Sequence, residues 1–185
     1  MLIRELIFFI VPLLAAGLAH HAVIIPRRLW LRLARPIDCD RLFHGQPLFG
    51  PAKTWRGIVI MVIGTGAVTW LLSYFVSLPL RVVPVLAGML FGFGYVFGEL
   101  PNSFIKRRLG IATSGRGQGI VGFIFIIVDQ CDSIIGALLA LYVLYQPSPQ
   151  LTGALFFAGV LIHVTVDLVL QRWSYKRRPL TTGYD

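Results

Sequence analysis

Two carboxylates lie inside one of the most apolar stretches of the chain. Asp129 and Asp132 stand at i and i+3 within the run Ile120–Tyr145, so a helix would present both on one face. A carboxylate at the centre of a bilayer costs at least about 2.5 kcal/mol, and a pair needs a shared cation or a water-filled cavity. Mg²⁺ prefers hard oxygen ligands and is often held by one or two carboxylates together with substrate phosphates. The pair predicts a magnesium site, and the alternative is an intramembrane ion pair or a capped helix break near Gly122.

Two polar segments combine glycines with cations and hydroxyl groups. The candidate phosphate-binding residues are Lys53, Thr54 and Arg56 in the first segment and Ser103, Lys106 and Arg107 in the second. A helix that begins at Arg56 or Gly57 would also point free N–H groups at the first loop, which suits phosphate. Cationic runs beside membrane spans often set topology only. Cations for phosphate next to carboxylates for Mg²⁺, however, predict phosphoryl or nucleotidyl transfer.

Three further ionisable residues border or interrupt the apolar runs. Glu99 ends one run and is either a solvated helix end or a third carboxylate of the metal site. His163 and Asp167 stand at i and i+4 and share one helix face. A hydrogen bond buried between helices explains this pair as well as membership of a polar cavity does, so both interpretations stand.

The composition places these residues in a membrane protein. Hydrophobic residues make up 56% of the chain and charged residues 14%, whereas soluble proteins have about 45–50% and about 25%. A length of 185 residues fits one domain over residues 1–185. Crossing about 30 Å of hydrocarbon takes about 20 apolar residues. The predicted fold is all-α, with transmembrane helices at Leu6–Ile25, Ile58–Leu78, Val82–Gly98, Ile120–Tyr145 and Leu151–Leu170, and tight turns at Pro79–Arg81 and Gln146–Gln150.

The distribution of cations orients these five helices. Fifteen of the 17 lysines and arginines lie between the first and second spans, between the third and fourth, or after the fifth. Because cations concentrate on the cytosolic side, we expect an outside N-terminus, a cytosolic C-terminus and two larger cytosolic loops. The net charge of +9 then faces anionic lipid, and no nucleic-acid partner is predicted. The segment Pro26–Arg35 predicts a short interfacial helix that anchors the chain.

Small residues and cysteines complete the structural expectations. The third span carries two small-xxx-small pairs, which allow helix backbones to approach closely; they are Gly88 with Gly92 and Gly94 with Gly98. Cys39 and Cys131 fit neither a disulfide framework nor a metal-ligand spacing, so both are predicted to be reduced thiols.

Three motifs, in this order along the chain, resemble the signatures of one family. One stretch resembles the first-loop signature of CDP-archaeol synthases; it consists of Pro36-Ile37-Asp38, Gly45 and Phe49–Gly57. Their second-loop signature resembles Glu99 with Ser103–Ile111, and their D-Q-x-D motif resembles Asp129–Asp132. The family is similar to the wider membrane CTP-transferases, which include the CDP-diacylglycerol synthases. Its members have five helices and a polar active-site cavity open to the cytosol, within a cell or plasma membrane.

The resemblance implies a reaction and a set of roles. CTP and a membrane lipid phosphate would give a CDP-lipid and pyrophosphate, with Mg²⁺ as cofactor. Asp129, Asp132 and Glu99 would hold the metal, and Thr54 and Ser103 would donate hydrogen bonds. The triphosphate would be neutralised by Lys53, Arg56, Lys106 and Arg107. Asp38 would either orient a cation or contact the cytidine.

The chain departs from the family pattern at three positions, and other functions compete. Glu99 stands where an aspartate is expected, no proline shortly precedes Asp129, and Ser133 stands where an aromatic residue is common. A CTP-dependent lipid kinase would use similar phosphate-binding loops but release CDP. An ion-coupled transporter would explain the buried acids but not the cationic loops. A CDP-alcohol phosphotransferase would need the string D-G-x-x-A-R, which is absent.

Overall fold

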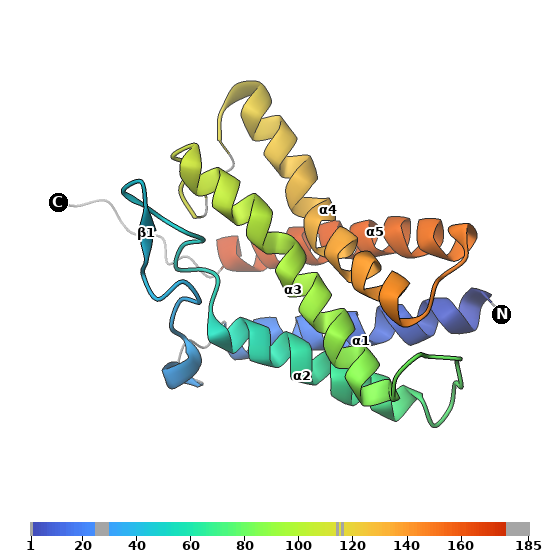
Figure 1. Cartoon of the computed structure of the whole chain (residues 1–185). Coiled ribbons are helices and arrows are strands. Elements are labelled where there is room, and N and C mark those ends of the chain that lie inside the picture. Colours follow the sequence, from blue (N-terminus) through green and yellow to red (C-terminus); the bar gives the residue numbers. More distant parts are fainter. Residues whose placement is uncertain (1, 25–29, 114, 116, 177–185) are drawn as a thin grey trace.

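Five long helices dominate the computed structural model, which describes residues 2–24, 30–113, 115 and 117–176 (Figure 1). The helices are α1 (Leu2–Ile24), α2 (Trp55–Leu72), α3 (Pro84–Arg108), α4 (Gly119–Leu144) and α5 (Pro149–Lys176). All five are long and apolar enough to cross a membrane. The predicted number and order of spans are therefore confirmed.

The helices on either side of the second connection have different bounds from those predicted. Helix α2 ends at Leu72, where the Ser73 hydroxyl donates to the Trp70 carbonyl at 2.6 Å. Residues 73–83 then form a longer connection than the predicted turn at Pro79–Arg81. Pro84 begins α3 at a position where the missing N–H of proline costs nothing.

Helix α3 continues from Gly98 to Arg108, and this corrects the prediction that Ser103, Lys106 and Arg107 lie in a loop. Three cations occupy its last turn, where positive charge interacts favourably with the helix dipole. Pro101 inside the helix is exposed and does not end it. Lys106 and Arg107, two of the candidate phosphate-binding cations, are consequently held on a helix and not in a loop.

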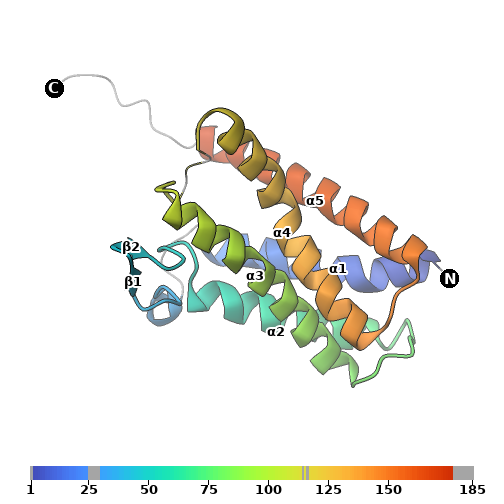
Figure 2. The same ribbon diagram turned by 45° about the horizontal axis from the view of Figure 1, so that its top comes forward.

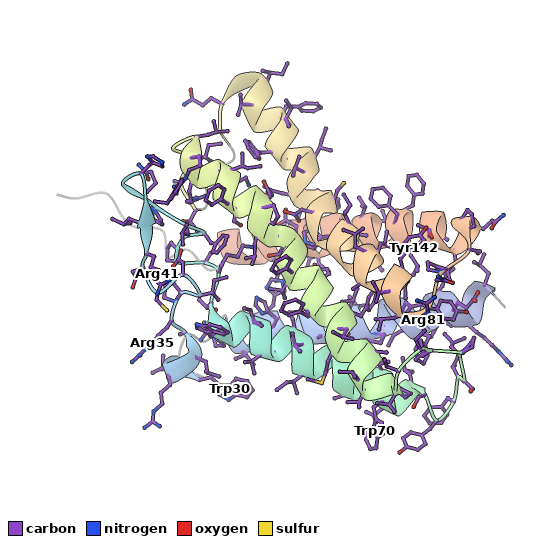
Figure 3. All side chains as sticks on the ribbon, in the orientation of Figure 1. Trp30, Arg35, Arg41, Trp70, Arg81 and Tyr142 are labelled. Atoms are coloured by element: carbon purple, nitrogen blue, oxygen red, sulfur yellow. The ribbon has the colours of Figure 1, made fainter. Side chains whose placement is uncertain are left out.

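Successive helices run in opposite directions, so the polar segments gather at one end of the bundle (Figures 1 and 2). Figure 3 shows Arg35 and Arg41 at this end, while Arg81 and Tyr142 lie at the other end. Arg81 is tied there by its N–H and guanidinium, which donate to the Leu144 and Val143 carbonyls at 3.0 and 3.2 Å. The separation of cations agrees with the alternation inferred from the charge pattern.

A small hairpin and one short 3₁₀ helix lie in the described part of the segment between α1 and α2. Strands β1 (Leu42–Phe43) and β2 (Gln46–Pro47) pair in antiparallel fashion. His44 and Gly45 between them both have positive φ, as type I′ hairpin turns require. The hairpin is an addition to the predicted all-α fold. Within Pro26–Arg35, residues 26–29 lie outside the described residues, and the remainder forms only a 3₁₀ turn at Leu31–Leu33 instead of an interfacial helix.

Helix α3 uses its glycines to approach two neighbouring helices. A Cβ atom added at Gly92 would lie 2.7 Å from the Met61 carbonyl oxygen of α2. On the α4 side, a Cβ added at Gly136 would lie 2.6 Å from Gly98 Cα and would also collide with the Gly94 carbonyl. The two small-xxx-small pairs therefore serve packing, with one pair facing α2 and the other facing α4.

We expect Gly136→Val to destabilise the bundle at the α3–α4 crossing. Forcing side-chain volume into a closed contact typically costs about 1–3 kcal/mol. The thermal unfolding midpoint in detergent measures this loss. Gly153→Val is the matched control, because a Cβ at Gly153 of α5 meets nothing within 4 Å. Equal midpoints for the two variants would contradict the proposed close contact.

Candidate active site

The loop before α2 is built around the buried carboxylate of Asp38. Its oxygens accept backbone N–H groups from Phe49 at 2.9 Å, Gly50 at 3.1 Å and Asp40 at 3.2 Å. Gly50 has a φ of 92°, a conformation that favours glycine. Asp38 thus organises the loop that precedes Lys53, a structural role that was not predicted from the sequence.

The end of this loop forms the start of α2. The Lys53 carbonyl accepts the Ile37 N–H at 2.8 Å, and the Trp55 N–H donates to the Arg35 carbonyl at 3.1 Å. Thr54 is the N-cap of α2, and its hydroxyl oxygen accepts the Gly57 N–H at 3.3 Å. The Trp55 and Gly57 N–H groups of the first turn therefore already have partners, and the phosphate-binding role of this helix terminus stays a prediction.

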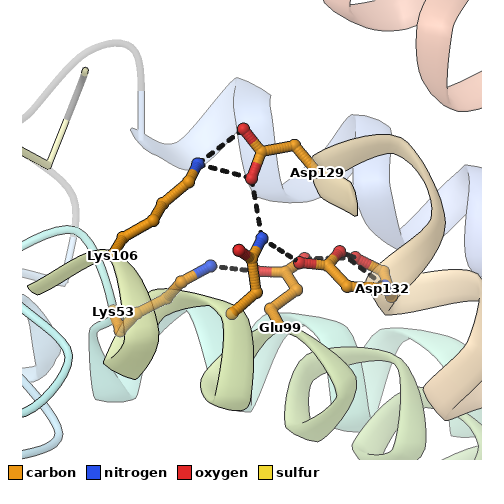
Figure 4. A network of polar contacts seen from close by, with 7 residues as sticks. Lys53, Glu99, Lys106, Asp129 and Asp132 are labelled. Atoms are coloured by element: carbon orange, nitrogen blue, oxygen red, sulfur yellow. Dashed lines mark hydrogen bonds and ion pairs between the residues drawn. The ribbon is translucent and has the colours of Figure 1, made fainter. Parts of the chain in front are cut away.

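The carboxylates and lysines of the candidate site form one network of polar contacts (Figure 4). The Asn102 amide nitrogen donates to Asp129 Oδ1 at 2.7 Å and to Asp132 Oδ2 at 2.6 Å. The Lys106 ammonium contacts both oxygens of Asp129, at 2.5 and 2.6 Å. These contacts bring the two aspartates of α4 against the final turns of α3.

A second ion pair joins the loop to the same network. Lys53 forms an ion pair with Glu99, and the Ser133 hydroxyl donates to the other Glu99 oxygen at 2.8 Å. The Ser133 N–H donates to Asp132 Oδ1 at 2.6 Å. All three predicted carboxylates and both predicted lysines consequently meet at one place.

The close approach of α3 and α4 explains why these side chains meet. A Cβ at Gly98 would lie 2.9 Å from Gly136 Cα, so the two backbones touch just beside Glu99. Glu99, Asn102 and Lys106 follow at helical spacing on the face of α3 toward α4. Sequence reasoning missed Asn102 and the role of Ser133. The three- and four-residue spacing of Asn102 from Glu99 and Lys106 was the available signal for Asn102.

The remaining predicted cations are Arg107, near the end of α3, and Arg56, at the start of α2. The Arg107 guanidinium donates to the Thr113 hydroxyl at 2.8 Å and to the Ala112 carbonyl at 3.2 Å. Arg56 is buried in the first turn of α2. Ser103 is half-buried on α3, and among the described residues it makes no hydrogen bond to the network.

Arg108, which was not a predicted site residue, anchors the hairpin to α3. Its guanidinium donates to the carbonyls of Phe43, Gln46 and Pro47, the second at 3.0 Å. It also stacks 4.9 Å from the ring centre of Phe104. The three consecutive cations of α3 therefore have three different partners: a carboxylate, the following loop and the hairpin.

The oxygen donors of the network suit a hard divalent cation. Within the described part of the chain, no three His, Cys, Asp or Glu side chains converge to hold a metal by themselves. The Asn102 amide oxygen is buried and has no hydrogen-bond partner, while the nitrogen of the same amide contacts Asp129 and Asp132. Two carboxylates and an unsatisfied amide oxygen fit Mg²⁺, which takes its remaining ligands from substrate phosphates and water.

Comparison with known proteins identifies the family. A family model described as CarS-like CDP-archaeol synthase matches residues 1–179. The CDP-archaeol synthase of Hyperthermus butylicus is 30% identical over 184 residues, which cover 95% of each chain. That of Archaeoglobus fulgidus is 34% identical over 160 residues, 78% of this chain and 83% of the relative. A chloroplastic phosphatidate cytidylyltransferase of Arabidopsis thaliana is 34% identical over 155 residues, 77% of this chain and 38% of the relative.

The helical arrangement also matches a solved structure. An intramembrane enzyme for the biosynthesis of archaeal membrane lipids is similar with a TM-score of 0.64 and 22% identity, over 88% of this chain and 92% of that one. At this identity the likeness establishes the fold, and it supports an integral membrane protein. The chain belongs to the CarS-like CDP-archaeol synthase family, and it is a CDP-lipid-forming cytidylyltransferase.

Proposed function

We propose that the protein transfers the cytidylyl group of CTP to the phosphate of a membrane lipid. An oxygen of the lipid phosphate attacks the α-phosphorus of CTP, the bond to the β-phosphate oxygen breaks, and pyrophosphate leaves. The observation that carries this proposal is the network in which three carboxylates and two lysines meet between α3, α4 and the loop before α2. Membership of the cytidylyltransferase family supports the same reaction.

The protein's own groups bind and orient charge in this reaction, and no protein nucleophile is needed. Lys53 and Lys106 neutralise the triphosphate and the leaving pyrophosphate, aided by Arg56 and Arg107. Thr54 and Ser103 offer hydroxyl hydrogens to phosphate oxygens. Both lysines are paired with carboxylates, so the binding of CTP would exchange these partners for phosphate oxygens.

Asp129 and Asp132 are the residues proposed to hold Mg²⁺, with Glu99 beside them. A bound Mg²⁺ would neutralise charge on the triphosphate and on the leaving group. This assignment agrees with the donor chemistry of the carboxylates and with the unsatisfied oxygen of Asn102. Removal of the divalent cation with a chelator is expected to abolish turnover reversibly.

The site is proposed to face the cytosol, with the N-terminus outside and the C-terminus inside. The cations of the connections support this orientation by their position in the sequence. The reaction supports it as well, because CTP is aqueous whereas the lipid phosphate is held in the membrane.

One assay tests the proposed function. Purified protein is incubated with Mg²⁺, CTP and a panel of lipid phosphates and lipid alcohols, and the products are separated. We expect pyrophosphate and a CDP-lipid from the lipid phosphates. CDP with a phosphorylated lipid alcohol would instead identify a lipid kinase, and no turnover with any lipid would reject both enzymes.

We expect Asn102→Ala to weaken the response to Mg²⁺ more than the response to CTP. The amide bridges Asp129 and Asp132, and its loss leaves two neighbouring carboxylates without their common donor. Loss of a group that orients metal ligands typically costs about 10–100-fold. Activity as a function of Mg²⁺ concentration measures the effect, and Ile105→Ala is the control, because Ile105 is an exposed residue of the same helix. A shift in the CTP dependence alone would contradict this role.

A further inference from the structure

Two cavities adjoin each other on the side of the network that faces α1 and α5. One, of about 240 Å³, has a mixed lining that includes Lys53 and Glu99 of the network together with His20. The other, of about 190 Å³, lies between α1, α3, α4 and α5. The two share four lining residues, and these mark the junction between them: Gly17, His21, Tyr95 and His163.

The second cavity is an apolar groove, which we name the α1–α5 groove. Its α1 wall runs from Phe9 to His21 and its α5 wall from Leu155 to Leu170. Its polar residues stand toward the junction, where His21, Tyr95 and His163 are joined by Asp167. The groove is therefore apolar toward the middle of the bundle and polar beside the network.

The length of the groove corresponds to one leaflet of a bilayer. From Phe9 to His21 a helix rises about 18 Å at about 1.5 Å per residue. Half of a hydrocarbon core of about 30 Å is about 15 Å. A lipid chain anchored by its headgroup at the junction would therefore extend along the groove to about the bilayer centre.

The groove is also accessible from the lipid. Only 6% of the most apolar stretch of α5 is buried inside the protein, compared with 22–33% for the other four helices. Leu18, which lines the groove, has 54% of its surface exposed. Helix α5 thus forms a loosely packed wall past which a hydrocarbon chain can enter from the side.

The junction offers groups that suit a phosphate. Lys53 and three histidines line the first cavity; the histidines are His20, His21 and His163. The His20 Nδ1 atom is buried and has no hydrogen-bond partner, while His163 Nδ1 lies 2.9 Å from Gln130 Oε1. Because Lys53 pairs with Glu99, a phosphate held here lies directly beside the carboxylate network.

We propose that the α1–α5 groove binds one hydrocarbon chain of the lipid phosphate substrate, and that the junction presents its phosphate to Lys53. This inference rests on the proposed function: the two substrates approach the network from different sides, and their reacting phosphates meet at Lys53. The lipid enters from α1 and α5, and CTP enters from the loops that surround Lys106 and Arg107. His163, whose role the sequence left open, becomes part of the lipid site.

Gly17→Leu is the sharpest test, because it fills the junction without displacing the protein. A Cβ at Gly17 meets nothing within 4 Å, and the same is true of Gly153, which lines neither cavity. We expect Gly17→Leu to raise the KM for a long-chain phosphatidate about tenfold or more, the scale of one misfitting apolar group. Dihexanoyl phosphatidate, whose short chains do not need the groove although its phosphate still needs the junction, should lose clearly less than the long-chain substrate, and Gly153→Leu should behave as the native protein.

A labelling experiment on the native protein separates this inference from the proposed function. Phosphatidate carrying a diazirine near the end of one chain is irradiated in phosphatidylcholine vesicles, and labelled peptides are identified by mass spectrometry. We expect labels on Leu14 and Ile162 of the groove, lost in Gly17→Leu, and no such labels with a matched phosphatidylcholine probe. Labels confined to outward-facing residues such as Ile63 and Phe157, or equal labelling by both probes, would contradict the proposal that the α1–α5 groove binds the lipid phosphate. A native protein that labels in the groove but forms no CDP-lipid would instead reject the proposed reaction alone.

Discussion

Asp132→Asn is expected to lose CDP-lipid formation by roughly 10³-fold, the scale of a single charge-stabilising group in phosphoryl transfer. The asparagine can still present its side-chain oxygen to the Asn102 amide, which now contacts Asp132 Oδ2 at 2.6 Å. The geometry of the bridge is therefore retained while the negative charge is removed. Because the lost property is charge toward Mg²⁺, the variant should insert and unfold like the native protein but fail in turnover.

The measurement combines activity, metal binding and stability. Activity is assayed with saturating CTP and lipid phosphate, and Mn²⁺ binding is followed by electron paramagnetic resonance in the presence of CTP. Asp40→Asn is the matched control, because Asp40 is exposed in the first loop and lies outside the network. Undiminished turnover, or unchanged Mn²⁺ binding together with lost turnover, would remove Asp132 from the metal site.

The membrane fold was predictable from the sequence because the bilayer imposes simple rules. Lipid requires helices of known length, and cations on alternate connections identify their order. The exact bounds were less predictable, since hydropathy marks where a helix leaves the hydrocarbon and not where it ends. Helix α3 leaves the apolar run near Gly98 but stays helical to Arg108, because its polar residues bury themselves against α4 and the loops.

The partners within the site were predictable only in part. The carboxylates and lysines could be predicted as site residues because a charge in or near the hydrocarbon is costly and is retained mainly where it has a function. The bridge by Asn102 and the anchoring of the hairpin by Arg108 depend on how closely α3 approaches its neighbours. The distance between α3 and α4 is set by Gly98 and Gly136, which lie far apart in the sequence.

Two departures from the family pattern prove to be physically connected. Glu99 replaces an expected aspartate, and Ser133 replaces a common aromatic residue. In the structure the Ser133 hydroxyl donates to the Glu99 carboxylate at 2.8 Å. The longer acid also reaches Lys53, which lies in the preceding loop. The Ser133 hydroxyl therefore satisfies one oxygen of Glu99, and both residues that depart from the expected pattern belong to the network.

Lys106→Met is expected to reduce kcat/KM for CTP by roughly 10²–10³-fold, the usual effect of removing one group that stabilises developing charge. Lys106 is buried, and both Asp129 oxygens contact its ammonium. Methionine retains the length of the aliphatic stem and removes the charge, so packing beside Phe125 changes little. The loss should appear in both the KM for CTP and the turnover number, because the triphosphate is charged before and during the transfer.

A double variant distinguishes a catalytic lysine from a purely structural ion pair. If Lys106 and Asp129 together form only a structural ion pair, then Lys106→Met leaves a half-buried carboxylate unpaired, and adding Asp129→Asn should restore the thermal stability and much of the activity. If Lys106 also binds phosphate, the double variant regains stability but stays inactive, because both the cation and the metal-binding carboxylate are missing. We expect the second result. The same pair of variants at Lys53 and Glu99 provides an independent comparison, since that ion pair connects the loop to the network and not α3 to α4.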